Sequence, residues 1–428
     1  MLTLTNARLF DGTRMLPGRH SVAIDGSQIG AVSDAGRPIP NGGERIDLGG
    51  MVLMPGLVSC HIHPDFFKFS IGIAMSGTPL GKELPPGVLM AIGIRTCRVL
   101  LESGFTGYLG ASCSNDIDAS LKIAIAEGII PGPRIRACGH HIGTTADLNQ
   151  SHHRWWQQMV GAGSDLFGDG PEELRKIVRD EIRRGVETIK IFVSDGHDTD
   201  RLDRNMARGE IAAIVRAAHE RGAKVRAHAC SKETILECVE LGVDLIDHGD
   251  EVDEACVDAM AKAGTFWVPS QRIPQQVAAM AAGTRSDVLA AQLASVGRML
   301  PLADRAGVRI LLGDDYSGFM RDMVDDDPLD HQVGNYGREL AWYGAIDGIS
   351  PEDVMRWGTK NAGEFLVDPP ARSGVIEVGA LADLIVIDGD PIADLSLFAR
   401  PQQALKAVIR DGAFAIDRLP PRPHSIAA

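Results

Sequence analysis

The chain has 428 residues, and its 43 Lys and Arg against 57 Asp and Glu leave a formal charge of −14 at pH 7. A chain this acidic is unsuited to coat a polyanion, so we expect no nucleic acid among its partners. With 44% hydrophobic and 23% charged residues it has the composition of a globular protein with a large core, which excludes a disordered or fibrous chain.

The first residues, MLTLTNARLF, lack the basic start and apolar block of a secretory signal, and no run in the chain approaches the ~18 apolar residues of a membrane span. We therefore expect a cytoplasmic protein without a membrane partner. The seven cysteines show no C-x-x-C spacing, so the sequence predicts neither a disulfide framework nor a thiolate zinc site.

Residues 1–56 are typical of short β segments separated by turns, with Asp25-Gly26 as a hairpin signal in SVAIDGSQIGAVS. The stretches GVIEVGALADLIVIDGD and LKAVIRDGAFAI, within 366–420, have the same texture. We expect the two segments to pair into one small composite β-sandwich domain, followed by a tail at 421–428.

Residues 57–365 instead alternate amphipathic helices with short apolar strands. In PEELRKIVRDEIRRGVETIKIFVS, Pro171 suits the first helical position, Gly185 ends the helix and Thr188 to Val193 form the strand. The same unit recurs in EIAAIVRAAHERGAKVRAHA, KETILECVELGVDLIDHG, ACVDAMAKAGTFWVPS and LASVGRMLPLADRAGVRILLGDD. Repeats of helix, glycine and strand predict parallel strands and a (β/α)8 TIM-like barrel, a fold of ~250 residues.

Histidines and a carboxylate stand at the ends of the expected strands. His61 and His63 lie two apart on an extended segment, so their imidazoles project from one face and can reach one ion. His228 closes KVRAHA, His248 closes LIDHG, and Asp315 closes RILLGDD, each at the carboxyl end where barrel enzymes keep their active sites. The adjacent Asp314 is disfavoured only by the expected pleat. Together these residues predict a metal centre.

Lys190 lies inside the strand TIKIFV, where alternation turns Ile189 and Ile191 toward the helices and Lys190 into the barrel. A buried ammonium ion is costly unless it is paired. One interpretation pairs Lys190 with Asp195 or Asp198. The other is that Lys190 has lost its proton and taken up carbon dioxide, giving a carbamate that bridges two metal ions.

The pattern resembles the amidohydrolase superfamily over essentially the whole chain, and within it the imidazolonepropionase-related, Xaa-Pro dipeptidase-like branch. The resemblance is carried by PGLVSCHIH, ETIKIFVS, VRAHAC, LIDHGD, LLGDD and GVIEVGALADLIVIDGDPIAD. It implies a binuclear centre of two divalent ions, zinc first, with manganese, cobalt or iron as alternatives. In this implied centre His61, His63 and Asp315 hold one ion, His228 and His248 hold the other, and carbamylated Lys190 bridges them.

The resemblance further implies hydrolysis of a C–N bond in a small amide, carbamate or urea, with Asp315 as the base that activates a hydroxide. Two other reactions use related sites, a mononuclear deaminase and a lactone or ester hydrolase. A deaminase has H-x-x-E on strand five, whereas the third residue after His228 is Ser231. A non-catalytic relative lacks ligands, and all six ligand residues are present here.

The third barrel loop departs from the TGGHGD pattern of dipeptidase-like members and reads Gly139-His140-His141-Ile142-Gly143-Thr144-Thr145-Ala146-Asp147. Dipeptidase specificity is therefore not implied. We expect His140 to act in catalysis, and His140, His141 and Tyr316 to contact the substrate. Two aromatic pairs, Trp155-Trp156 and Phe66-Phe67, suit an apolar or aromatic substrate or plain loop packing. We also expect a homo-oligomer.

Overall fold

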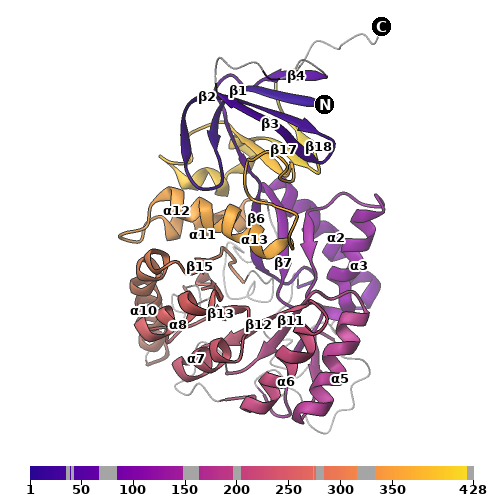
Figure 1. Cartoon of the computed structure of the whole chain (residues 1–428), viewed down its shortest axis with the longest axis vertical. Helices are drawn as coiled ribbons and strands as arrows, with labels where there is room; N and C mark the ends of the chain where they lie inside the picture. Colours follow the sequence, from indigo (N-terminus) through magenta and orange to yellow (C-terminus); the bar gives the residue numbers. More distant parts are fainter. Residues whose placement is uncertain are drawn as a thin grey trace.

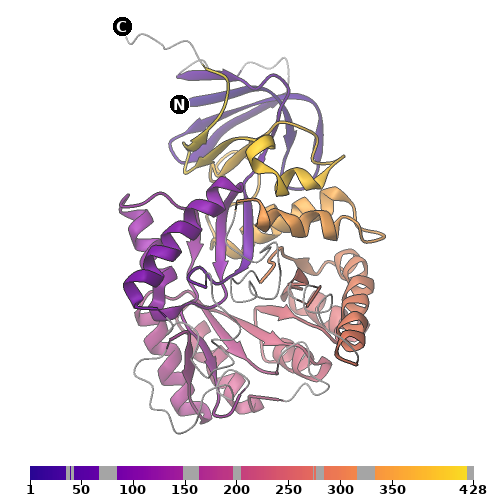
Figure 2. The ribbon, with the colours of Figure 1, turned by 180° about the vertical axis from the view of Figure 1, so that it is seen from behind.

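The computed structural model describes residues 1–34, 39, 43–66, 84–147, 163–195, 204–272, 274–275, 284–315 and 333–421, with 34 and 284–286 as backbone only. Figures 1 and 2 show a β domain that contains the amino terminus and stands against one side of a larger α/β barrel. The amino-terminal strands and the last strands of the chain lie together in this β domain, so the chain leaves it, builds the barrel and returns.

The composite β domain is one continuous hydrogen-bonded sheet in the order β18-β17-β16-β5-β1-β2-β3, with β4 beside β1. The two ends of the chain meet where β16 pairs antiparallel with β5. The predicted hairpin is present, because Asp25 and Gln28 face each other across the turn that contains Gly26. The strands are β1 (Leu2–Phe10), β2 (Met15–Asp25), β3 (Gln28–Asp34), β4 (Glu44–Asp47), β5 (Val52–Pro55), β16 (Leu384–Ile387), β17 (Leu405–Arg410) and β18 (Ala413–Asp417).

The barrel is built from parallel strands, and the predicted fold is confirmed. Its strands form two hydrogen-bonded sets, and backbone hydrogen bonds join the two sets at both junctions. Thr188 N donates to Ala137 O at 3.0 Å at one junction, and Cys60 N donates to Leu312 O at 2.7 Å at the other. In the described residues its strands are β6 (Leu57–Ile62), β7 (Phe105–Gly110), β8 (Arg134–Arg136) with β9 (His141–Gly143), β11 (Thr188–Phe192), β12 (Lys224–Ala229), β13 (Leu245–His248), β14 (Phe266–Val268) and β15 (Arg309–Ile310).

Helices cover the outside of the barrel, and each predicted helix–glycine–strand unit is present. The helix predicted from Pro171 ends before Gly185, whose φ of +100° suits glycine. Within the described residues, no helix is both long and apolar enough to cross a bilayer. The helices are α2 (Pro86–Glu102), α3 (Ile117–Ala126), α5 (Gly170–Arg183), α6 (Arg208–His219), α7 (Lys232–Glu240), α8 (Glu254–Ala263), α10 (Thr284–Ala306), α11 (Arg338–Tyr343), α12 (Pro351–Arg356), α13 (Ala362–Leu366) and α14 (Pro401–Ala404), with a π-helical turn η4 (Trp357–Asn361) and 3₁₀ turns η1 (Ser114–Asp116), η3 (Asn335–Gly337) and η5 (Leu395–Ala399).

The third barrel strand is interrupted, which the sequence did not lead us to expect. β8 pairs with β7, but after residues 137–140 the chain resumes as β9, which pairs with β11 on one side and with an additional strand, β10 (Asp165–Phe167), on the other. Gly139 makes the bend possible, because its φ is +66° and a Cβ there would lie 2.5 Å from Glu181 Oε2. The bend decides which way His140 and His141 point.

Side chains alternate across the barrel wall as predicted. Ile189 and Ile191 belong to the core shared with the helices, and Lys190 is buried on the opposite face of β11. Across the strands, Asp165, His141, Lys190 and Arg226 are successive register partners, so they lie side by side on the inner face.

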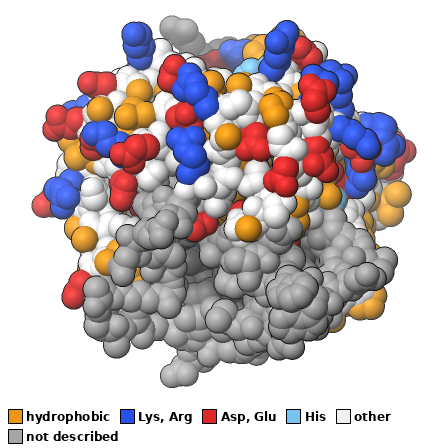
Figure 3. Space-filling view, turned by 90° about the horizontal axis from the view of Figure 1, so that it is seen from below, with side chains coloured by type: hydrophobic (Ala, Val, Ile, Leu, Met, Phe, Trp, Pro, Cys, Tyr) orange, Lys and Arg blue, Asp and Glu red, His pale blue; other side chains and the backbone are white. Residues whose placement is uncertain are grey.

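Seen from below, Lys and Arg side chains are interspersed with Asp and Glu over the described part of the surface (Figure 3). On this face the described residues form no continuous patch of one sign.

Candidate metal centre

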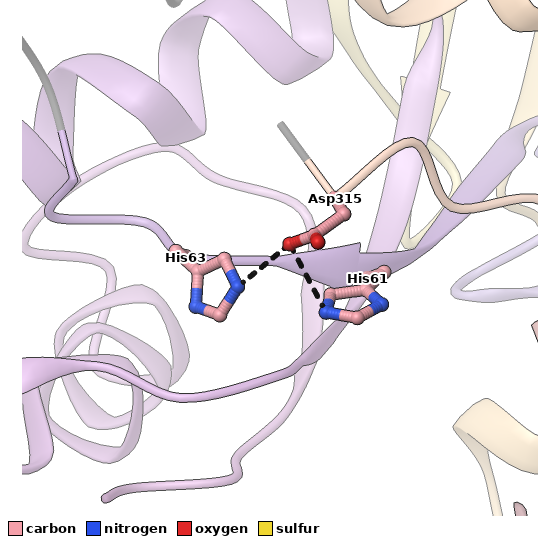
Figure 4. Close-up of side chains that lie close together, drawn as sticks. All are labelled: His61, His63 and Asp315. Atoms are coloured by element: carbon pink, nitrogen blue, oxygen red, sulfur yellow. Dashed lines mark hydrogen bonds and ion pairs between the residues drawn. The ribbon is translucent and has the colours of Figure 1, made fainter. Parts of the chain in front are cut away.

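Three predicted ligands converge at the carboxyl ends of the first and last barrel strands. Asp315 Oδ1 lies 3.2 Å from His61 Nε2 and 3.0 Å from His63 Nε2 (Figure 4). The ligand atoms of these residues all lie within 4.8 Å of one another. Asp314, the alternative carboxylate, lies instead near Glu339 on α11, where the burial of Glu339 and then the charge of Asp314 raise the pKa of Glu339. The turn after β15 thus presents Asp315 to the histidines.

Hydrogen bonds on the outer ring nitrogens prepare both histidines to bind a metal. His63 Nδ1 lies 3.1 Å from Ser112 O, and His61 Nδ1 lies 2.8 Å from Ser270 Oγ. A proton on Nδ1 leaves the lone pair on Nε2, which is the nitrogen that faces Asp315. Burial, followed by the charges of Lys190 and Arg226, holds the pKa of His61 well below its usual value, so its imidazole is neutral. The donor set therefore fits a divalent ion.

His248 and His228 continue this row of imidazoles. The ring of His248 lies 5.1 Å from that of His61 and 4.5 Å from that of His228. A φ of +70° ends β13 at His248, whose carbonyl accepts a hydrogen bond from Trp267 Nε1 at 2.8 Å. His228 Nε2 lies 3.2 Å from Asp195 O and 3.3 Å from Cys230 Sγ. The rings of His248 and His228 thus lie beside the cluster of His61, His63 and Asp315, although their ligand atoms are not part of that cluster.

Lys190 has a partner that was not predicted. Its Nζ donates to Asp247 Oδ2 at 2.6 Å, whereas the sequence suggested Asp195 or Asp198, of which Asp198 lies outside the described residues. Asp247 is fully buried and also accepts hydrogen bonds from the buried Arg226. The alternation in KVRAHA already places Arg226 on the same face as His228, so it was the available sequence signal for this network.

Burial and pairing oppose each other in this network. Burial lowers the pKa of Lys190, and the nearby carboxylate of Asp247 only partly offsets that effect. Burial alone would raise the pKa of Asp247, but Arg226 and Lys190 bring it below its ordinary value. Asp247 is therefore a carboxylate held between two cationic groups.

His141 lies on the inner face beside Lys190, which is its register partner. Its Nε2 lies beside Asp165 of the additional strand β10, and both of its ring nitrogens are buried without a hydrogen-bond partner among the described residues. The ring of Phe192 lies 4.8 Å from that of His141 and stacks on that of His228 at 4.3 Å. His141, Asp165 and Phe192 therefore border the histidine row, and of these the sequence singled out only His141.

His140, for which the sequence predicts a catalytic role, contacts two carboxylates outside the row of imidazoles. Its Nδ1 lies 3.2 Å from Asp116 Oδ1 and 3.2 Å from Glu181 Oε2, and its backbone N–H donates to Glu181. Glu181 belongs to α5, so the bend in strand three turns His140 out toward the helical layer while His141 turns inward. This triad is a second group of potential metal ligands. Its geometry equally suits one proton shared between the imidazole and the two carboxylates, and His140 would then have a structural role.

We expect His140→Gln to destabilise the protein in a pH-dependent way. Burial alone would lower the pKa of His140, but its bonds to Asp116 and Glu181 raise it from 6.5 to about 10. Removing one member of a buried ion pair costs roughly 3–5 kcal/mol. Because the folded pKa is the higher one, this stabilisation is complete below pH 6.5 and declines as pH rises through about 10.

Denaturant unfolding of both proteins at pH 6, 8 and 10 measures this difference in the free energy of unfolding. His219→Gln is the matched control, because His219 has a single carboxylate partner, Asp244, and is 42% exposed. A difference between His140→Gln and the parent that stays constant from pH 6 to pH 10 would argue against a protonated His140.

The remaining predicted substrate contacts fall largely outside the described residues. Tyr316, Phe67, Trp155 and Trp156 are in this group. Phe66 is described, and its ring stacks on that of His63 at 4.8 Å with an interplanar angle of 8°. One member of the predicted aromatic pairs thus contacts a ligand residue directly.

Comparison with known proteins gives consistent matches. Residues 52–414 match the family described as the Amidohydrolase family. Ochratoxinase of Aspergillus niger is 26% identical over 391 residues, covering 82% of this chain and 73% of that protein. A prolidase crystallised with N-methylphosphonate-L-proline superimposes with a TM-score of 0.80 at 27% identity, covering 97% of this chain and 99% of that one. The structure of A. niger ochratoxinase has a TM-score of 0.82 at 23% identity, with coverage of 97% and 95%.

Proposed function

The chain belongs to the amidohydrolase family and is a hydrolase, and from that premise we propose that it cleaves a C–N bond of a small amide, carbamate or urea with the help of bound metal ions. The observation that carries the proposal is the convergence of His61, His63 and Asp315 at the carboxyl ends of two barrel strands. Active sites of barrel enzymes are built at this end.

We propose two divalent ions, zinc first, with manganese, cobalt or iron as alternatives. His61, His63 and Asp315 would hold one ion, and His228 and His248 the other, with Lys190 carbamylated between them. When bound, such ions lower the pKa of a water molecule and polarise a carbonyl group. Charge balance supports the carbamate. As an ammonium ion, Lys190 would join Arg226 against the single carboxylate of Asp247, which opposes binding of further cations.

Asp315 is the proposed base. Its carboxylate would accept a proton from the attacking water and pass it to the leaving nitrogen. His141 would contact the substrate, because its two ring nitrogens are buried polar atoms without a hydrogen-bond partner among the described residues. The rings of Phe66 and Phe192, stacked on His63 and His228, favour an apolar or aromatic group beside the scissile bond.

The deaminase alternative requires a glutamate at the end of H-x-x-E, and this chain does not have one there. At the position where H-x-x-E would place a glutamate, Ser231 is the N-cap of α7, and its Oγ accepts a hydrogen bond from Thr234 N at 3.3 Å. A lactone or ester hydrolase would use the same groups and is the second candidate.

The test is an assay of zinc-loaded protein against N-acyl amino acids, aryl amides, carbamates, ureas and lactones, with chelator-stripped protein as the control. We expect turnover of at least one C–N substrate that needs the metal. Metal-dependent turnover of lactones alone would favour the second candidate. Failure of the protein to bind metal would contradict the proposed function.

Asp315→Asn is expected to lower kcat by at least ~10², with little change in substrate binding, because the amide keeps the size of the side chain but cannot accept the proton. Steady-state kinetics on metal-loaded protein measures both quantities. Asp314→Asn is the neighbouring control. If Asp315→Asn kept the parent rate while Asp314→Asn lost it, the base would be Asp314.

A further inference from the structure

Arg226 sits inside the barrel and joins three other strands to β12. Its Nη1 donates to Gly110 O of β7 at 2.6 Å, and its Nη2 donates to Cys60 O of β6 at 2.9 Å. Its Nε donates to Asp247 Oδ2 of β13 at 3.0 Å. The guanidinium is fully buried, and its planar fork suits several acceptors held in fixed directions. Arg226 therefore joins three of the strands that carry predicted ligands, β6, β12 and β13, and connects them to β7.

Asp247 connects this arginine to two of those ligands. One carboxylate oxygen, Oδ2, accepts from Lys190 Nζ at 2.6 Å, and the other, Oδ1, lies 3.4 Å from His61 Nδ1. Cys60, whose carbonyl Arg226 holds, directly precedes His61 in the chain. Both His61 and Lys190 are thus positioned through groups that Arg226 contacts.

We propose that the buried Arg226–Asp247 pair is a positioning unit that sets His61 and Lys190 for metal binding, an inference that rests on the proposed function. A buried ion pair commonly adds little net stability over apolar residues of the same volume, because both charges must leave water. In this role the pair fixes the directions in which His61 and Lys190 point. The groups behind a metal ligand set its orientation, and their loss typically costs ~10–100-fold in metal affinity or activity.

The experiment measures metal affinity and kinetics in Arg226→Met and in a matched control. Arg136 is a second buried arginine of the barrel, but it lies near the opposite end, where it donates to Thr188 Oγ1 at 3.1 Å and pairs with Asp368. Arg136→Met therefore removes a buried barrel arginine without touching the predicted centre. The probe ions are Zn²⁺ and Co²⁺, with chelator competition for affinity and the visible spectrum of Co²⁺ for ligand geometry.

We expect Arg226→Met to weaken Zn²⁺ binding by at least ~10-fold, to shift the Co²⁺ spectrum and to lower kcat more than it changes KM. Arg136→Met should lose stability while keeping the affinity and spectrum of the parent.

Arg226→Lys keeps the charge without the fork and applies the same test if Arg226→Met does not fold, with weaker Zn²⁺ binding than the parent expected. Parent-like Zn²⁺ affinity and Co²⁺ spectrum in the folded Arg226 variant would overturn the inference, as would an equal loss of affinity in Arg136→Met. A parent protein that binds no metal would overturn the proposed function and, with it, this inference. A metal-binding parent with unaffected Arg226 variants would overturn the positioning role alone.

Discussion

Replacing Lys190 by Ala is expected to remove metal binding and activity together, with a loss of kcat/KM of roughly 10³ or more, equivalent to several kcal/mol of transition-state stabilisation. Lys190 is buried between Asp247 and the histidine row, so a carbamate on its nitrogen would supply the negative oxygens that two cations require. Because a carbamate is chemically close to a short carboxylate, acetate or propionate should restore part of the activity of Lys190→Ala.

Lys224→Ala is the matched control for this experiment. Lys224 begins the next strand, and its Nζ lies over the ring of Phe365, away from the histidines. We expect this variant to keep its metal content and to gain nothing from added acetate. A crystal of metal-loaded parent protein whose electron density ends at Lys190 Nζ, still paired with Asp247, would rule out the carbamate and favour a single-ion site.

His61→Ala is expected to reduce bound zinc from near two ions per chain to one or fewer and to lower kcat by roughly 10³, since several kcal/mol of electrostatic stabilisation would be lost. The chain should stay folded, because the barrel strands are held by apolar packing and His61 lies at their carboxyl end. Elemental analysis, circular dichroism and steady-state kinetics test the three parts of this expectation.

His219→Ala provides the control, since it removes a histidine from the barrel's outer surface. It should change neither zinc content nor rate. Full turnover of His61→Ala with an unchanged zinc content would remove His61 from the ligand set, and the neighbouring His63 and His248 would then have to be tested as its replacements.

The sequence by itself determined the barrel and the positions of the candidate ligands along it. Helical spacing, a glycine at each helix end and a short apolar strand are local signals, and each acts within about 20 residues of chain. His61, His228 and His248 follow from the same reading, because parallel strands bring their carboxyl ends to one side of a barrel. Alternation within TIKIFV was enough to turn Lys190 inward.

Only the tertiary structure decided which charges meet inside the barrel. Asp247 is 57 residues from Lys190 in the chain, and its role depends on the register of three neighbouring strands, which no local pattern specifies. The bend at Gly139 likewise separates two adjacent histidines that were both predicted to contact the substrate. It turns His140 to Glu181 on α5 and leaves His141 beside Lys190. A short irregularity in one strand changes the facing of every residue after it, because side chains alternate with a period of two.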